Sequence, residues 1–93
     1  MITVYKYSLE PGDNVTVLMP EGAEILHVAT QGDVPCIWAR VDTERPKKPY
    51  IFHMRGTGHP NATGDHVGSF LMHNGSLVFH LFCVSPMVVR LGV

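Results

Sequence analysis

Short runs of alternating apolar and polar residues follow one another along nearly the whole chain. This period of two is typical of β-strands that bury one face. The runs cover residues 2–9, 15–19, 23–30, 36–41, 50–55, 70–73, 77–83 and 87–91. No segment repeats apolar residues with a helical period, and glycine or proline interrupts the chain about every ten residues, so helices are not expected. The pattern predicts an all-β fold, a small β-sandwich or partly open β-barrel of about six to eight mainly antiparallel strands.

The string FLMHNGSLVFHLF contains a hairpin whose register follows from its turn. Asn74-Gly75 suits a two-residue type I′ loop, because both central positions need a positive φ. The rungs are then His73–Ser76, Met72–Leu77, Leu71–Val78, Phe70–Phe79 and Ser69–His80. Side chains alternate, so the core face carries Phe70, Met72, Leu77, Phe79 and Leu81. The other face is mixed and is expected to meet solvent, a ligand or another subunit; it carries Ser69, Leu71, His73, Val78, His80 and Phe82.

A second hairpin is predicted in ILHVATQGDVPCIWARV, with Gly32-Asp33 as a type II′ loop. One face would hold the pairs Val28–Ile37 and Leu26–Ala39, and the other Ala29–Cys36, His27–Trp38 and Ile25–Arg40. Pro35 cannot donate a ladder hydrogen bond, so its strand should lie at a sheet edge or begin there. The polar run DTERPKKP is expected to be a solvated loop.

The composition narrows the classes of partner. Ninety-three residues make one domain, residues 1–93. Only 16% of the residues are charged, which favours a surface partly covered by a partner or by another copy of the chain, and a homo-oligomer is expected. A net charge of −1 argues against duplex nucleic acid as a partner. The chain shows neither a signal peptide nor an apolar stretch of membrane-spanning length, so a cytoplasmic protein is expected, with Cys36 and Cys83 as buried thiols.

The six histidines do not predict a metal site. His66, His73 and His80 recur at a spacing of seven, but the hairpin register puts His73 and His80 about 13 Å apart. One metal ion cannot bind both, since its ligand nitrogens lie about 2 Å away. A site built from His59, His66 and a residue of another strand stays open. We expect no bound metal and no cofactor.

Nucleophilic catalysis has little support in the sequence. Ser69, Ser76, Cys36 and Cys83 lie in no nucleophile elbow or Cys-His motif, and the carboxylates fall in turns or in the exposed loop. We therefore expect no catalytic residue and a protein that is not an enzyme.

His27, Trp38 and Arg40 form the first candidate binding group. The first two are expected to be cross-strand neighbours, with Arg40 one same-face step from the indole. A flat aromatic ring beside a guanidinium suits a nucleobase or another planar ring. The alternative is a core or interface tryptophan whose edge Arg40 covers.

The loop GTGHPNATGDH, residues 56–66, is the second candidate. Its glycines allow backbone N–H groups to turn inward, as in anion-binding nests, and Arg55 and His59 would add positive charge. No helix with GK[ST] follows, so the loop is not a P-loop. The remaining alternatives are a plain connector and an oligomer contact. The candidate ligand-binding residues are His27, Trp38, Arg40, Arg55, Gly56, Thr57, Gly58 and His59.

Several strings together resemble a family of small phage and bacterial proteins that is known as a domain of unknown function. They are VYKYSLE, LMPEGAEILHVATQGDVPCIWARVD, GTGHP, and HVGSF followed by GSLVFHLF, and they span residues 3–82. The matching positions include Pro35, Cys36, Trp38, Gly56, Gly58, His59, Gly68 and His80. The resemblance implies a phage or prophage context and supplies no catalytic residues. Small phage accessory proteins often act on host defence, and some of them are compact oligomers that sequester cyclic or ADP-ribose-derived nucleotide signals without cleaving them.

The leading hypothesis is therefore a phage-encoded, non-catalytic "sponge" that captures a small nucleotide-like molecule in the host bacterial cytoplasm and counters host defence. One alternative is a structural or protein-interaction module, such as a virion component or an inhibitor of a host protein. The other is a small metal-dependent hydrolase that uses His59, His66 and a further ligand.

Overall fold

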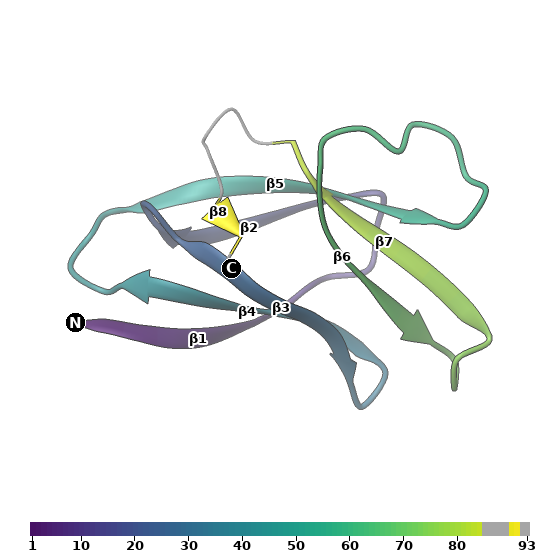
Figure 1. Cartoon of the computed structure of the whole chain (residues 1–93), viewed down its shortest axis with the longest axis horizontal. Coiled ribbons are helices and arrows are strands. Elements are labelled where there is room, and N and C mark those ends of the chain that lie inside the picture. Colours follow the sequence, from purple (N-terminus) through teal and green to yellow (C-terminus); the bar gives the residue numbers. More distant parts are fainter. Residues whose placement is uncertain (85–89, 92–93) are drawn as a thin grey trace.

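The chain folds into two four-stranded sheets that pack face to face (Figure 1). The computed structural model describes residues 1–84 and the backbone of 90–91. The strands are β1 (Ile2–Ser8), β2 (Asn14–Pro20), β3 (Glu24–Gln31), β4 (Val34–Asp42), β5 (Lys47–Gly56), β6 (Asp65–Met72), β7 (Leu77–Cys83) and β8 (Arg90–Leu91). The first sheet has the order β1-β4-β3-β8 and the second β2-β5-β7-β6. All strand pairs are antiparallel except β3 with the two-residue β8. The expected all-β fold is confirmed, and of the two expected architectures it is the β-sandwich.

The core lies between the sheets and follows the alternation of the sequence. On β5, Tyr50, Phe52 and Met54 point inward and are buried, whereas Ile51 points outward. The same alternation holds in β2, where the buried residues are Val15, Val17 and Met19. Cys36 and Cys83 are both buried, as expected.

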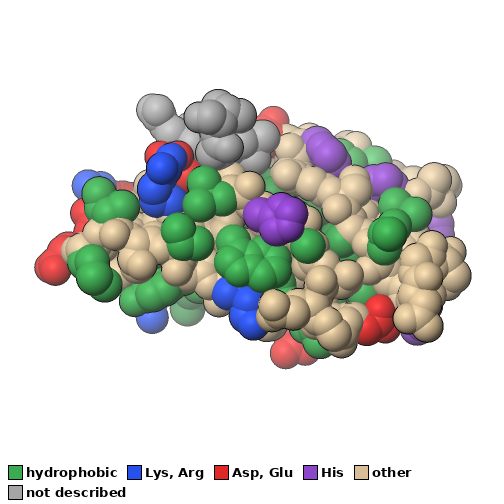
Figure 2. All heavy atoms as spheres, turned by 60° about the horizontal axis from the view of Figure 1, so that its bottom comes forward, with side chains coloured by type: hydrophobic (Ala, Val, Ile, Leu, Met, Phe, Trp, Pro, Cys, Tyr) green, Lys and Arg blue, Asp and Glu red, His purple; other side chains and the backbone are tan. Residues whose placement is uncertain are grey.

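Hydrophobic side chains also remain on the outward faces. In Figure 2, which brings the lower side of Figure 1 forward, they gather across the middle of the molecule beside histidine and basic side chains. The exposed large hydrophobic residues include Ile2, Val4, Leu18, Leu26, Leu71, Leu77 and Val78. This surface agrees with the low charge of the sequence.

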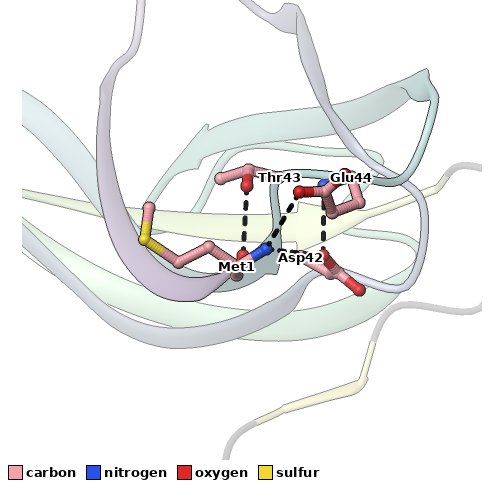
Figure 3. A network of polar contacts seen from close by, with 4 residues as sticks. All are labelled: Met1, Asp42, Thr43 and Glu44. Carbon is pink, nitrogen blue, oxygen red and sulfur yellow. Dashed lines mark hydrogen bonds and ion pairs between the residues drawn. The ribbon is translucent and has the colours of Figure 1, made fainter.

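The start of β1 is attached to the turn between β4 and β5 (Figure 3). The ammonium group of Met1 lies 3.4 Å from an Asp42 carboxylate oxygen and 3.6 Å from one of Glu44. The backbone N–H of Thr43 donates to the Met1 carbonyl over 2.9 Å. The Glu44 backbone N–H donates to the Asp42 carboxylate, and this bond is the main reason that the pKa of Asp42 is lowered. These contacts align β1 with β4 over seven residue pairs without a bulge.

The 69–82 hairpin has the predicted register from Met72–Leu77 to Ser69–His80. The turn is longer than predicted, because residues 73–76 all leave the ladder and the expected His73–Ser76 rung is absent. His73, Asn74 and Gly75 all adopt a positive φ, and the Ser76 N–H donates to the His73 carbonyl. Phe70 and Leu81 are buried as expected, but Leu77 is exposed because it lies at the end of the strand, beside the turn.

The 25–41 hairpin differs from its prediction in two ways. Gly32 and Asp33 both have a positive φ, of 57° and 61°, which makes the turn type I′ rather than type II′. Aspartate tolerates this conformation, and its carboxylate accepts a hydrogen bond from the His73 N–H over 2.8 Å. The predicted register holds from Ala29–Cys36 to His27–Trp38 and then shifts at a bulge. Leu26 is the extra residue, so Ile25 pairs with Ala39 and faces the core instead of lying on the Trp38 face.

Strand ends were the least predictable part of the fold. β5 already begins at Lys47, inside the expected loop, because residues 47–49 complete the ladder to β2. β6 begins at Asp65 rather than at residue 70, because His66 and Asp65 pair with the end of β7. Pro35 is the second residue of β4, which lies between β1 and β3 and not at an edge. Of the run expected at 87–91, residues 87–89 lie outside the described part of the chain.

Candidate functional site

Trp38 lies on the outer face of the first sheet, opposite the core. Its neighbours Ile37 and Ala39 are fully buried and point inward, so the indole points away from the second sheet and is half-buried. The exposed His27 lies directly across on β3. The two ring centroids are 5.4 Å apart and the ring planes are tilted by 44°. The predicted aromatic pair is therefore present, and the indole is not required to fill the core.

The charges beside this pair are held by other side chains. Lys6 pairs with Trp38 across β1 and β4, and its ammonium nitrogen donates to the Gln31 side-chain oxygen over 2.7 Å. Arg40 forms an ion pair with Glu24, with 2.6 Å between nitrogen and oxygen. Sequence reasoning missed both Lys6 and Glu24, because their strands lie beside Trp38 and Arg40 only in the folded sheet. Arg40 can bind an anionic ligand only if its guanidinium contacts Glu24 and the ligand together, or if the ion pair with Glu24 breaks.

The glycine-rich loop borders a polar pocket at one end of the second sheet. The pocket has a volume of about 310 Å³ and is lined by Asp13, Asn14, Arg55, His59, Pro60 and Asn61. Its size is at the lower end for small-molecule sites. An adjoining apolar cavity of about 170 Å³ shares Asp13 and includes Phe70, Phe79 and Met54.

Arg55 connects two backbone segments beside this pocket. Its Nη1 donates to the Asp13 and Met54 carbonyls, and its Nε donates to the Asn61 carbonyl over 3.1 Å. The guanidinium thus joins the β1–β2 turn to the loop that follows β5. This role was not visible in the sequence, where Arg55 was expected to neutralise phosphate.

Several backbone N–H groups of the loop already have acceptors inside the protein. Those of Thr57, His59 and Thr63 donate to the carbonyls of Val78, Gly56 and Asn61. The His59 ring packs over Gly56, since a Cβ there would lie 3.1 Å from two ring atoms. In this conformation these three N–H groups are not available to an anion.

The two candidate groups belong to different sheets. His27, Trp38 and Arg40 lie on β3 and β4, whereas Arg55 lies at the end of β5 and the loop continues from there. The pocket beside Arg55 and His59 has no lining residue from the His27–Trp38 face. Within residues 1–84, no group of three or more His, Cys, Asp or Glu side chains is arranged to hold a metal ion. None of the described segments is a helix long and apolar enough to cross a membrane.

Replacing Arg55 by methionine should lower the free energy of unfolding by about 1–2 kcal/mol, because several carbonyls lose a charged donor. Urea denaturation of the variant and its parent would measure the loss. Arg40→Met is the matched control, because it removes only a surface ion pair and should change stability by less than about 0.5 kcal/mol. Equal losses in the two variants would contradict the connecting role of Arg55.

The fold and these surface features define a small all-β sandwich domain whose candidate binding groups lie outside its core. The chain belongs to the family described as a domain of unknown function, DUF7352, whose model matches residues 1–90. This agrees with the expected membership in an uncharacterised domain family. No curated protein and no solved structure matches the chain.

Proposed function

We propose that the protein is a non-catalytic binding protein that captures a small nucleotide-like molecule on its His27–Trp38 face. The observation that carries the proposal is the half-buried indole, which lies beside an imidazole on an outward sheet face. An aromatic ring in this position can stack a nucleobase. Lys6, on the neighbouring strand, can supply positive charge to a phosphate.

A ligand stacked on one sheet face keeps its other side in water, so tight capture needs a cover. We propose that a second copy of the chain provides it, which makes the protein a homo-oligomer. The exposed side chains of Ile2, Val4 and Leu26 near the face, together with the low charge, support this arrangement. The loop residues Arg55, Gly56, Thr57, Gly58 and His59 of one copy would border the Trp38 face of the other.

The biological setting of the proposal comes from the sequence resemblance. In this setting the protein is encoded by a phage, acts in the host bacterial cytoplasm and sequesters a nucleotide-derived immune signal. It needs neither a cofactor nor duplex nucleic acid for this role.

Trp38→Ala is expected to weaken nucleotide binding about tenfold or more, because base–aromatic stacking contributes about 1–3 kcal/mol. Calorimetric titration with cyclic and ADP-ribose-derived nucleotides would measure the change. The bound molecule should be recovered intact after denaturation. Phe82→Ala is the matched control, because Phe82 is a half-buried aromatic residue of the other sheet.

Three outcomes would reject parts of this proposal. Binding of no panel member would reject nucleotide capture. Unchanged binding by Trp38→Ala would reject the placement of the site. Recovery of a cleaved nucleotide would indicate an enzyme, such as the metal-dependent hydrolase considered above.

One further observation favours an interaction module as the second candidate function. Leu71 and Val78 pair across β6 and β7 near the tip of the hairpin, and both side chains are exposed on the outer face of the second sheet. An exposed apolar pair of this kind is typical of a protein contact. A virion component or an inhibitor of a host protein would use this tip, and Leu71→Asp would then abolish the association without affecting nucleotide binding.

A further inference from the structure

Four polar side chains on the outer side of the second sheet form a continuous hydrogen-bonded chain. Ser69 on β6 pairs with His80 on β7, and its Oγ lies 2.8 Å from His80 Nδ1. The other ring nitrogen, His80 Nε2, lies 2.8 Å from Thr57 Oγ1. On the opposite side, His66 Nε2 lies 3.2 Å from Ser69 Oγ. The hairpin register brings Ser69 and His80 together, and the bend after β5 adds Thr57.

The direction of the protons in this chain follows from the contacts. Thr57 Oγ1 also lies 3.4 Å from the Val78 carbonyl oxygen, which can only accept, so the threonine hydroxyl donates there. It must then accept a hydrogen bond from His80 Nε2–H. A neutral imidazole carries one N–H, so His80 Nδ1 is left with a lone pair that faces Ser69. Ser69 Oγ–H donates to this nitrogen, and Ser69 Oγ accepts from His66 Nε2–H. This arrangement satisfies all the contacts at once.

The same arrangement has the parts of an activated nucleophile. A hydroxyl donates to a basic imidazole, and a third group fixes the tautomer of that imidazole. His66 Nε2–H donates to the same hydroxyl oxygen; it orients this oxygen and must release it as the new bond forms. Ser69 and His66 are exposed, so a reagent can reach the oxygen from solvent.

We propose that Ser69 is a nucleophile that accepts an acyl or phosphonyl group from an activated ester or fluoride. Ser69 Oγ forms the new bond to the carbonyl carbon or the phosphorus, and the bond to the leaving group breaks. The hydroxyl proton passes to His80 Nδ1 and then to solvent. Thr57 is a positioning residue that holds the His80 tautomer. The product is a stable covalent adduct, so this reactivity goes beyond the proposed binding function and does not depend on it.

The test uses an alkyl fluorophosphonate, which releases fluoride when a serine oxygen attacks its phosphorus. Intact-mass measurement should show one adduct, and peptide mapping should place it on Ser69. Ser69→Ala should remove the adduct, and His80→Gln should slow its formation about 100-fold or more. Ser76→Ala is the matched control and should react like the parent. Ser76 is an exposed serine of the same hairpin whose Oγ donates to the His73 carbonyl and has no imidazole acceptor among its described contacts.

Two variants of Thr57 test the positioning role. Thr57→Val should slow labelling about tenfold, because nothing then holds the proton on His80 Nε2, whereas Thr57→Ser should restore the parent rate. Circular dichroism and thermal melting would verify that each variant is folded. The proposal is wrong if no adduct forms, if the adduct lies on another residue, or if His80→Gln reacts as fast as the parent. Equal labelling rates for Thr57→Val and Thr57→Ser would show that Thr57 does not position His80.

Discussion

Replacing Gly64 by alanine is expected to lower the free energy of unfolding by about 3 kcal/mol. Gly64 has a φ of +105°, a conformation that costs side-chain-bearing residues about 1–3 kcal/mol. A Cβ would also lie 2.7 Å from the Cys83 carbonyl oxygen and 2.5 Å from Val84 Cγ1. The carbonyl belongs to the end of β7, so the loop would have to move away from the sheet. Such overpacking adds about 1–3 kcal/mol.

Gly58→Ala separates the two causes of this effect. Gly58 lies in the same loop with a φ of +85°, but a Cβ there meets nothing within 4 Å. The Gly58→Ala variant should therefore lower the free energy of unfolding by only about 1 kcal/mol, from the backbone conformation alone. Urea denaturation, with the melting temperature as a second readout, would measure both variants. If the two losses are equal, the loop is not packed against β7 as the structure has it.

Phe52→Ala should cause the largest loss of stability, about 4 kcal/mol. The ring is fully buried in the middle of β5 and packs in the core between the two sheets. Its removal forfeits apolar burial and leaves a cavity that the surrounding strands cannot close completely. Chemical denaturation would measure this loss. Since domains of this size are marginally stable, Phe52→Leu serves as a milder variant if the alanine form does not fold.

The neighbouring residue supplies the control for this prediction. Ile51 points outward from the same strand and is 36% exposed. Ile51→Ala should therefore cost less than about 1 kcal/mol. A larger loss from Ile51→Ala than from Phe52→Ala would mean that β5 presents its opposite face to the core.

The glycine-rich loop contacts several other parts of the structure. Gly64 allows its end to lie against β7, and Arg55 joins its middle to the β1–β2 turn. Thr57, near its beginning, contacts His80. The loop is therefore held in place by specific contacts at its beginning, its middle and its end. These contacts place it beside the Ser69 chain, and not beside Trp38.

The sequence by itself determined the fold class, most of the strand positions and the central registers of both hairpins. Alternation of apolar and polar residues has a period of two, and Asn74-Gly75 has few ways to turn, so both signals are local. For the same reason the His27–Trp38 and Ser69–His80 pairs were predicted correctly.

Only the tertiary structure decided which strands share a sheet and what each polar side chain contacts. The bulge at Leu26 arises because Ile25 must face the core, and that core exists only once the second sheet is in place. Arg40 meets Glu24, Arg55 meets Asp13, and Thr57 meets His80 through contacts between residues 16 to 42 positions apart. No local pattern encodes such contacts, because they depend on how both sheets pack. That packing separates Trp38 from the loop within one chain and brings Ser69 between two histidines.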